Sequence, residues 1–300
     1  MENSIWSSRI QGVLNLDLSR ELRFRDDRKD LFLSLLGLDE GMTVLDVGCG
    51  PGAITRKLSA WLGEYTRIIG VDRDTEFIQY AREKATRMNL KNVSYYVGDA
   101  LKLPLEDNSV DACISHTVIE HVPHREFLLE QKRVCRPTGR VSVMYARPDK
   151  YIKTEPAALP KQCKREIELL DKLLKNSDGV VEEYNVGKYW PDPIKLPELF
   201  EGIGFKHIQV DAIAIPIVID DSRNDLEKKM TIIQAEKEQL FESIEMVIRS
   251  ALGKIRDDEI VELKGLIEER TYKRLKLVQD GTRIWDYAIL SLQIVSGMVG

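Results

Sequence analysis

The sequence predicts an α/β protein: a mostly parallel sheet of seven strands with helices on both faces. From Met42 onward, short apolar runs alternate with amphipathic helical segments. Strands that alternate with helices are joined by right-handed crossovers, which makes neighbouring strands parallel and places helices on both faces. A glycine-rich turn, residues 48–52, follows the first apolar run, as expected where a buried strand leads directly into a helix.

Seven apolar runs supply the strands of this sheet. We predict strands at 43–47, 67–72, 93–97, 110–115, 140–145, 206–215 and 287–295. The spacing of apolar residues predicts helices at 53–62, 75–88, 125–134, 161–175 and 197–203. The alternation is interrupted twice in the later part of the chain, and we expect inserted helical material there.

The chain divides into six predicted segments around one core. Its 300 residues are enough for one large domain with a cap. The segments are 1–37, helical and ending at Gly37; 38–146, the core with the glycine turn; 147–194, a cap insertion; 195–220, a core helix and strand; 221–281, a helical hairpin; and 282–300, the last core strand. Ser222 with Asp225 resembles a capping box that begins the hairpin, and Gly253 separates its helices. The apolar spacing leaves open whether the hairpin is a substrate lid or a dimerisation surface, which would make a homodimer.

Composition disfavours several classes of protein. The formal net charge is −5 and no basic arm is present, whereas a nucleic-acid binder normally shows a basic face. The cysteines form no CxxC pair, which argues against a metal centre or a disulfide framework and for a cytoplasmic protein; they are Cys49, Cys113, Cys135 and Cys163. The N-terminus lacks a signal-peptide pattern, and no apolar run approaches the roughly 20 residues of a membrane span.

The glycine turn carries the first functional signal. Residues 44–47 suit a strand that is buried on both faces, and Asp46 is the one acid in it. A buried carboxylate needs hydrogen-bond donors, and a turn of glycine amides provides them. Gly48 and Gly50 allow backbone to approach a ligand closely, because they have no Cβ.

The main competitor for this turn is a dinucleotide-binding loop. That loop has the spacing GxGxxG, and Ala53 stands at the position of its last glycine, where alanine is allowed. Asp46 favours a different ligand, because a carboxylate beside the turn repels a pyrophosphate. S-Adenosylmethionine (SAM) presents a cationic sulfonium and an amino group, so an acid at this place is favourable.

Acidic residues end the next two strands as well. Asp72 follows Gly50 by 22 residues, near the roughly 20 expected for an acid that binds ribose hydroxyls, whether in NAD or in SAM. Arg73 is predicted either to cover the adenine or to be a solvated surface residue. Asp99 and the Ala100 amide are positioned for the adenine edge, although Gly-Asp is also frequent in turns. Ligands of open α/β sheets bind at the carboxyl ends of the strands, where all three acids fall.

These motifs resemble those of class I SAM-dependent methyltransferases, in particular the group that includes ubiquinone and menaquinone C-methyltransferases. VLDVGCGPG, GVDRD and GDA are similar to the first three motifs of that superfamily, and Ser115 begins a stretch similar to the end of its fourth strand. The resemblance implies a Rossmann-like core with an antiparallel last strand beside the fifth, SAM as the cofactor, and Cys49 and Ser115 among its contacts. The commoner form of the turn before the fifth strand has glycine where this chain has Thr138.

Methyl transfer from SAM is an in-line displacement that depends on alignment and on exclusion of water. A general base is needed only where the acceptor loses a proton. His116, Glu120 and His121 follow the fourth strand and are the candidates, with a structural role for Glu120 and His121 at the helix start as the alternative. Arg20, Arg23 and Arg28 are candidates for an acidic acceptor or the cofactor carboxylate, or are solvated.

The sequence therefore predicts a SAM-dependent methyltransferase that acts on a small-molecule acceptor. The acceptor atom, O, N, S or C, is left open. The Asp/Asn-Pro-Pro-aromatic signature of adenine and cytosine amino-methylases is absent after the fourth strand, and no cysteine cluster favours arsenite. An NAD-dependent oxidoreductase and a non-enzymatic SAM-binding protein are the alternatives.

Overall fold

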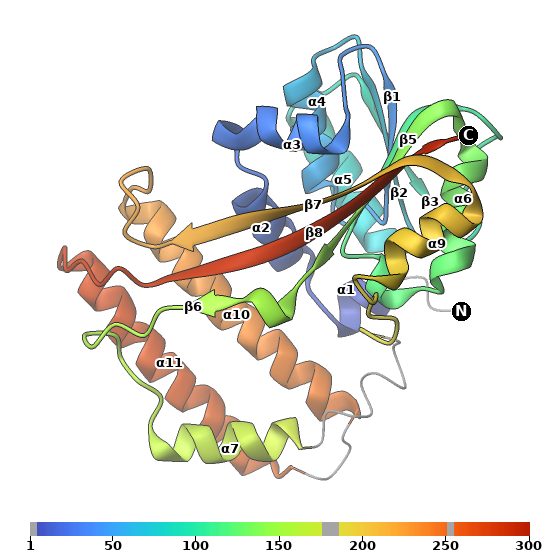
Figure 1. Cartoon of the computed structure of the whole chain (residues 1–300). Helices are drawn as coiled ribbons and strands as arrows, with labels where there is room; N and C mark the ends of the chain where they lie inside the picture. Colours follow the sequence, from blue (N-terminus) through green and yellow to red (C-terminus); the bar gives the residue numbers. More distant parts are fainter. Residues whose placement is uncertain (1–4, 176–185, 251–254) are drawn as a thin grey trace.

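The computed structural model describes residues 5–175, 186–250 and 255–300 and contains one mixed sheet of eight strands. The strand order is β3-β2-β1-β4-β5-β8-β6, and β7 pairs with β8 (Figure 1). The strands are β1 (Thr43–Val47), β2 (Arg67–Asp72), β3 (Val93–Val97), β4 (Val110–His116), β5 (Cys135–Ala146), β6 (Ile152–Lys153), β7 (Phe205–Val218) and β8 (Tyr287–Val299). The first five are parallel, so their carboxyl ends meet at one edge of the sheet.

The last strand of the chain is antiparallel to its neighbours. β8 lies between β5 and β7 and pairs antiparallel with both. The predicted fold class is thereby confirmed, with one addition: the two-residue strand β6 pairs with β8 beyond the end of β5. β7 and β8 form a long ribbon whose far end leads into helices α10 and α11 (Figure 1).

Helices cover the two faces of the sheet and bury its apolar residues. On one face, α3 (Lys29–Leu36) and α4 (Ala53–Leu62) pack on alternate residues of β1, β2, β4 and β5. On the other face, α6 (His124–Val134) and α9 (Lys195–Ile203) pack on the intervening residues of the same four strands. Helix α5 (Thr75–Arg87) packs against the Tyr95 side chain of β3. These buried layers hold the carboxyl edge of β1, β2 and β4 in place.

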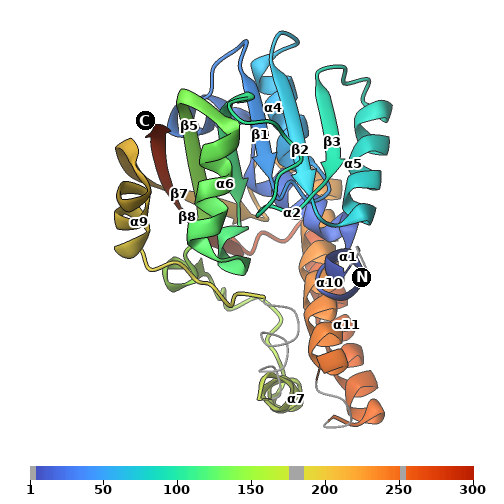
Figure 2. The same cartoon turned by 90° about the vertical axis from the view of Figure 1, so that its right-hand side faces the viewer.

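The N-terminal segment is helical as predicted, but it is broken into pieces. It contains α1 (Ile5–Arg9), α2 (Val13–Arg23), a short 3-10 turn and α3, which ends at Gly37 in the left-handed conformation. Figure 2 shows α1 and α2 below the carboxyl ends of the strands. The breaks let these helices cross the open edge of the sheet.

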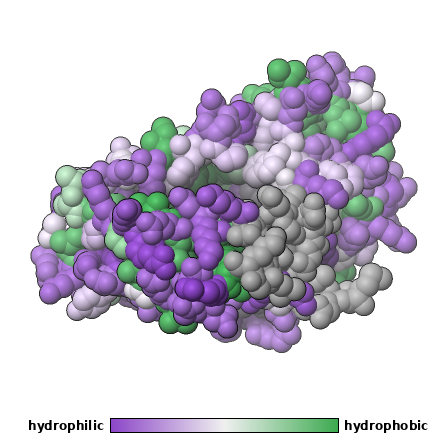
Figure 3. Space-filling view, turned by 90° about the horizontal axis from the view of Figure 1, so that it is seen from below, coloured by the Kyte–Doolittle hydropathy of each residue, from purple (hydrophilic) through white to green (hydrophobic). Residues whose placement is uncertain are grey.

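Three helices form a cap at the same end of the molecule. They are α7 (Lys164–Leu174), α10 (Leu226–Ser250) and α11 (Asp257–Gln279), and their apolar residues make a separate cluster. Figure 3 views this end and shows a mostly hydrophilic surface with a hollow near its centre. None of the helices in the described ranges has the length and apolar character needed to cross a membrane.

The capping-box prediction for the hairpin was wrong in one detail. Asp225, not Ser222, caps α10, because its Oδ1 accepts a hydrogen bond of 2.8 Å from the Lys228 amide. The predicted break at Gly253 lies outside the described residues.

Thr138 adopts a left-handed conformation with φ +66° and is exposed. A β-branched residue is strained there, and this explains why the commoner form of the turn has glycine. We expect Thr138→Gly to raise the free energy of unfolding by about 0.5–1 kcal/mol, because the relief of strain exceeds the entropy that glycine adds to the unfolded chain. Urea denaturation measures the change. Asn108→Gly, at φ +54°, is the control and should gain less, since asparagine tolerates this conformation; a loss of stability in Thr138→Gly would contradict the explanation.

Candidate functional site

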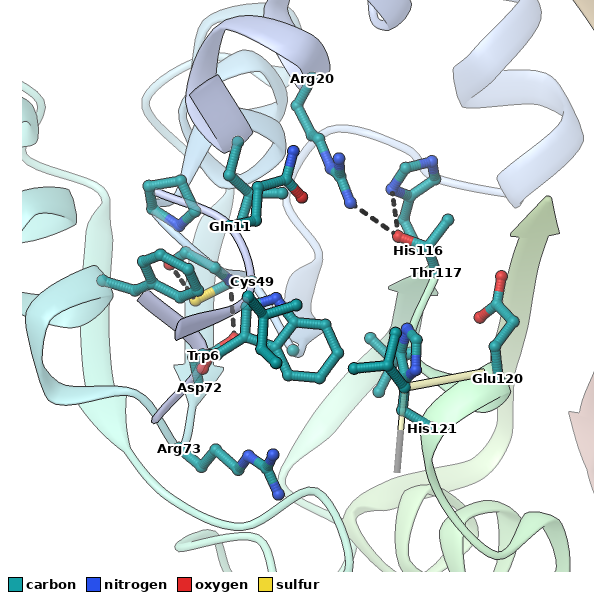
Figure 4. A pocket seen from close by; sticks show the side chains of 18 of the residues that line it. Trp6, Gln11, Arg20, Cys49, Asp72, Arg73, His116, Thr117, Glu120 and His121 are labelled. Atoms are coloured by element: carbon teal, nitrogen blue, oxygen red, sulfur yellow. Dashed lines mark hydrogen bonds between the residues drawn. The ribbon is translucent and has the colours of Figure 1, made fainter. Parts of the chain in front are cut away.

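A cavity of about 380 Å³ opens at the carboxyl ends of β1, β2 and β4 (Figure 4). The glycine turn and the end of β2 form one wall, and the residues after β4 form the opposite wall. Helices α1, α2 and α10 close it from the side of the cap. This position at the carboxyl edge of the sheet is the one at which α/β proteins bind ligands. The volume falls within the range of small-molecule sites, roughly 300–1,000 Å³.

Backbone hydrogen bonds hold the glycine turn at the end of β1. The amides of Gly48 and Cys49 both donate to the Val71 carbonyl, at 2.8 and 3.0 Å. Gly48 has φ +69°, and a Cβ on it would lie 2.3 Å from a methyl carbon of Val118. Glycine is therefore required at this position both by conformation and by the close approach of the loop after β4. Gly48, Cys49 and Gly50, which the sequence analysis assigns to the cofactor, all line the cavity.

Asp72 lies at the centre of this wall. One carboxylate oxygen accepts the Gly50 amide at 2.8 Å, and the other accepts the Asp74 amide at 2.9 Å. Burial raises the pKa of Asp72 to about 6, and the hydrogen bonds from Asp74 and Gly50 oppose the rise. Each carboxylate oxygen has a second lone pair, so Asp72 retains acceptor capacity toward the cavity.

Two predicted cofactor contacts, Asp46 and Ser115, do not line the cavity. The Asp46 carboxylate is buried behind the turn, where it accepts the Thr55 hydroxyl at 2.7 Å. Ser115 is also fully buried, and its hydroxyl has no hydrogen-bond partner among the described residues. Side chains alternate along a buried strand, and these two point into the protein, so a direct contact is not supported. Burial raises the pKa of Asp46 to about 7, with a further contribution from the charge of Asp72.

Replacement of Asp46 by asparagine tests this burial. The folded-state pKa is raised from 3.8 to about 7, so the folded protein binds the extra proton and wild-type stability falls as the pH rises between these values. Asparagine keeps an acceptor for Thr55 and carries no charge. Relative to wild type, Asp46→Asn should gain stability from pH 4 to pH 8 by about 4 kcal/mol, since one pKa unit corresponds to about 1.4 kcal/mol.

Urea denaturation of both proteins at the two pH values measures this difference. Exposed Asp39→Asn is the control and should change the free energy of unfolding by less than about 0.5 kcal/mol at either pH. A pH-independent difference for Asp46→Asn would show that folding does not raise the pKa of the Asp46 carboxyl group.

The adenine-side candidates lie at the outer part of the cavity. Asp99 and Ala100 line the cavity. The Asp99 Oδ1 also accepts a hydrogen bond from the Leu101 amide at 2.8 Å, which is the turn contact that the sequence analysis gives as the alternative role of Asp99. Arg73 is exposed and lies 5.9 Å from the ring centroid of Trp6. Trp6 belongs to α1 and occupies the middle of the opening in Figure 4.

A buried ion pair that the sequence analysis missed supports the turn from behind. Arg56, on α4, donates to the Pro51 carbonyl at 2.6 Å and pairs with buried Asp17 on α2. Lys84 on α5 also pairs with Asp17. A buried arginine with its carboxylate fixes both elements, so the glycine turn and α2 are held together. The local sequence does not distinguish these residues from charged surface residues, because Arg56 and Lys84 lie 39 and 67 residues from Asp17 along the chain.

The opposite wall contains the three candidate bases. Oε1 of Glu120 accepts the Ala146 amide at 3.0 Å, whereas its Oε2 is buried with no partner among the described residues. Burial raises the pKa of Glu120 to about 7. His116 is buried against Phe24, and burial, with the charges of Arg20 and Arg23, keeps its pKa well below 6.5.

His121 has a structural contact that fits the alternative weighed for it. Its Nδ1 accepts the Gly187 amide at 2.9 Å, so it anchors the segment after α7. Its ring also lies edge-on to Trp6, with centroids 4.7 Å apart. The structure thus brings all three candidates to the cavity, with His121 engaged by the cap.

Helix α10 contributes directly to the cavity. Glu242 accepts the Gly12 amide at 3.0 Å, which ties α10 to the junction of α1 and α2. The other cavity residues of this helix are Gln239, Ser243 and Met246. Of the two interpretations left open for the hairpin, its position at the cavity supports a lid.

The family model described as "Methyltransferase domain" matches residues 38–190. A demethylmenaquinone methyltransferase of Staphylococcus haemolyticus is 30% identical over 179 residues, which are 57% of this chain and 71% of that protein. An arsenite methyltransferase of Halobacterium salinarum is 36% identical over 104 residues, 34% of this chain and 27% of that protein.

Solved structures share the fold over a longer span. Phosphoethanolamine N-methyltransferase 2 of Haemonchus contortus, in complex with SAM, aligns over 99% of this chain and 60% of its own length, with a TM-score of 0.57 and 17% identity. This similarity concerns the fold alone. The match covers between 27% and 44% of the length of the first three curated relatives.

Proposed function

Because the chain belongs to the family of methyltransferase domains, we propose that it transfers a methyl group from SAM to a small-molecule acceptor. One observation carries the proposal: Asp72, which ends β2, faces the cavity and holds the glycine turn through the Gly50 amide. A carboxylate there is suited to the two ribose hydroxyls of an adenosine.

The charges near the turn favour SAM over a dinucleotide. Besides burial, the charges of Asp46 and Asp72 both raise the pKa of the Cys49 thiol in the turn, and the Asp72 charge raises the pKa of Asp46. Negative charge at this place repels a pyrophosphate and attracts a sulfonium or ammonium group. In its ionised form, above its pKa of about 7, Asp46 therefore acts through its field and not through a direct contact. Asp99, Ala100 and Arg73 are proposed for the adenine, with Trp6 covering the opening.

SAM supplies, when bound, a methyl group on a sulfonium sulfur that departs as a neutral thioether. The work of this chain is to align the acceptor with that methyl group and to exclude water. Helices α1, α2 and α10 form the wall that excludes water. For an acceptor that loses a proton, we assign Glu120 as the general base, because its Oε2 is buried without a partner and its pKa lies near neutral pH.

Transfer of a labelled methyl group tests the activity. The protein is incubated with SAM carrying a tritiated methyl group and with a panel of small phenols, amines, thiols and organic acids. We expect transfer to at least one class, abolished in a Gly48→Val variant that obstructs the turn. Tight binding of SAM with no transfer across the panel would favour a non-enzymatic SAM-binding protein.

The remaining sequence predictions concern the cellular location and the binding partners of the protein. A cytoplasmic location, a homodimer through α10 and α11, and the absence of a nucleic-acid partner stay predictions. Light scattering of the purified chain measures the assembly.

A further inference from the structure

Two arginines of α2 line the inner end of the cavity. Arg20 donates from Nη2 to the Thr117 hydroxyl at 2.8 Å and from Nη1 to the Ser19 hydroxyl at 2.8 Å. Arg23 lies one turn further along the helix, and its Nε is buried with no hydrogen-bond partner among the described residues. Figure 4 shows Arg20 on the side of His116 and Glu120, across the cavity from Asp72 and Arg73.

The charge of this arginine pair is not balanced within the described part of the chain. Neither guanidinium has a carboxylate oxygen within 4.0 Å there, and burial lowers the pKa of both groups. Glu120 is the acid whose charge acts on both, but it lies beyond salt-bridge distance and its own pKa is raised. The side chains of Arg20 and Arg23 are half-buried, and a cation that is partly removed from water without an acidic partner is unfavourable, so an anionic ligand would stabilise this pair.

The two arginines differ in what they face. Along α2, Leu16 lies against Gly50, Arg20 reaches Thr117 after β4, and Phe24 packs on His116, so the helix runs away from the glycine turn. Arg23 also lines a second cavity of about 540 Å³ between α2, α10, α11 and the β7–β8 ribbon.

Arg23 stands out among the basic residues of this second cavity. The other four have acidic partners within 4.0 Å; these pairs are Lys153–Glu236, Lys237–Glu238, Arg270–Glu166 and Arg274–Glu236. The unbalanced charge is therefore located at the junction of the two cavities. SAM has one carboxylate and can neutralise only one of the two arginines, and Arg20 is the nearer to the turn.

We propose that Arg23 binds an anionic group of the methyl acceptor, a carboxylate or a phosphate, at the junction of the two cavities. This assignment rests on the proposed function, because it takes the turn and Asp72 as the place of SAM. A planar guanidinium with five donors is suited to the oxygens of either anion. The acceptor thus enters from the second cavity, and its anionic group fixes the orientation of the reacting atom.

Titration with inorganic phosphate tests the site without knowledge of the acceptor. Isothermal calorimetry is performed on the full chain saturated with S-adenosylhomocysteine, with sodium chloride at matched ionic strength as the blank. We expect wild type to bind phosphate with a Kd of about 1–10 mM. Arg23→Gln should weaken binding at least about tenfold, as for a lost hydrogen bond to a charged group. Arg23→Lys should retain most of it, because the positive charge remains.

Arg28→Gln is the matched control. It removes the same charge from a residue that lies outside both cavities and donates to the Ala214 carbonyl at 2.8 Å, and we expect unchanged phosphate binding. Equal affinity in wild type and Arg23→Gln, or no binding by wild type up to about 30 mM, would overturn the proposal. Phosphate that competes with S-adenosylhomocysteine would assign Arg23 to the cofactor carboxylate instead. If S-adenosylhomocysteine does not bind to the wild-type chain, the proposed function fails. A loss of phosphate binding in Arg23→Gln, measured in the absence of S-adenosylhomocysteine, would still locate an anion site at Arg23.

Discussion

Asp72→Ala is expected to weaken binding of S-adenosylhomocysteine by about 3 kcal/mol, roughly a hundredfold rise in Kd. A carboxylate that accepts two ribose hydroxyls contributes about 1.5–3 kcal/mol. The upper end applies because the same side chain also holds the Gly50 and Asp74 amides, at 2.8 and 2.9 Å. Its loss releases the turn as well as the ribose contact. Calorimetric titration of the folded variant measures the change.

Asp99→Ala serves as the comparison for this variant. Asp99 is exposed and one of its oxygens is engaged in a local turn, so we expect a loss of about 1 kcal/mol. Circular dichroism of both variants checks that they fold. Affinity of Asp72→Ala equal to that of wild type would show that Asp72 does not hold the ribose.

Glu120→Gln is expected to lower kcat by about 10²–10⁴ for an acceptor that loses a proton. Glutamine keeps the size of the side chain and an acceptor for the Ala146 amide, but it cannot take up a proton. Binding of S-adenosylhomocysteine should change less than about threefold, because this wall lies opposite the turn. Steady-state kinetics of wild type and the variant at saturating SAM measure kcat, and calorimetric titration with S-adenosylhomocysteine measures the affinity.

The pH profile separates Glu120 from His116. Burial raises the pKa of Glu120 to about 7, and a base acts in its deprotonated form, so kcat/KM should rise as the pH increases through 7 and then level off. His116 has a pKa well below 6.5, so a rise completed at acidic pH would assign the proton to His116. A kcat of Glu120→Gln equal to that of wild type would contradict a role for this residue as the base.

The sheet and the cofactor side of the site were predictable because their signals are local. The strands β1, β2 and β3 and the helix α4 begin and end at the predicted residues. In these elements an apolar run meets a glycine turn or a polar helix start, and no distant contact is needed to define the ends. Asp72 likewise follows from its distance along the chain to the glycine turn.

The other features depend on contacts between distant parts of the chain. β7 and β8 extend past their predicted ends because each supplies the pairing partner of the other, from Val218 with Tyr287 to Phe205 with Val299. Asp46 was expected at the ligand, but the hydroxyl of Thr55, on the following helix, takes its carboxylate. Trp6 is held over the cavity by its neighbour Ser7, whose amide donates a hydrogen bond of 2.8 Å to the Asp74 carboxylate. Asp74 lies 67 residues further along the chain, so the local sequence does not indicate this contact.

Titration of the wild-type chain with S-adenosylhomocysteine and, separately, with NAD tests the central claim most directly. Both contain an adenosine that Asp72 can hold, but only NAD brings a pyrophosphate to the turn beside Asp46 and Asp72. We expect one molecule of S-adenosylhomocysteine to bind per chain with a Kd of about 1–50 μM, and no heat from NAD at the same concentrations. Binding of NAD without binding of S-adenosylhomocysteine would contradict the assignment of this chain as a SAM-dependent methyltransferase.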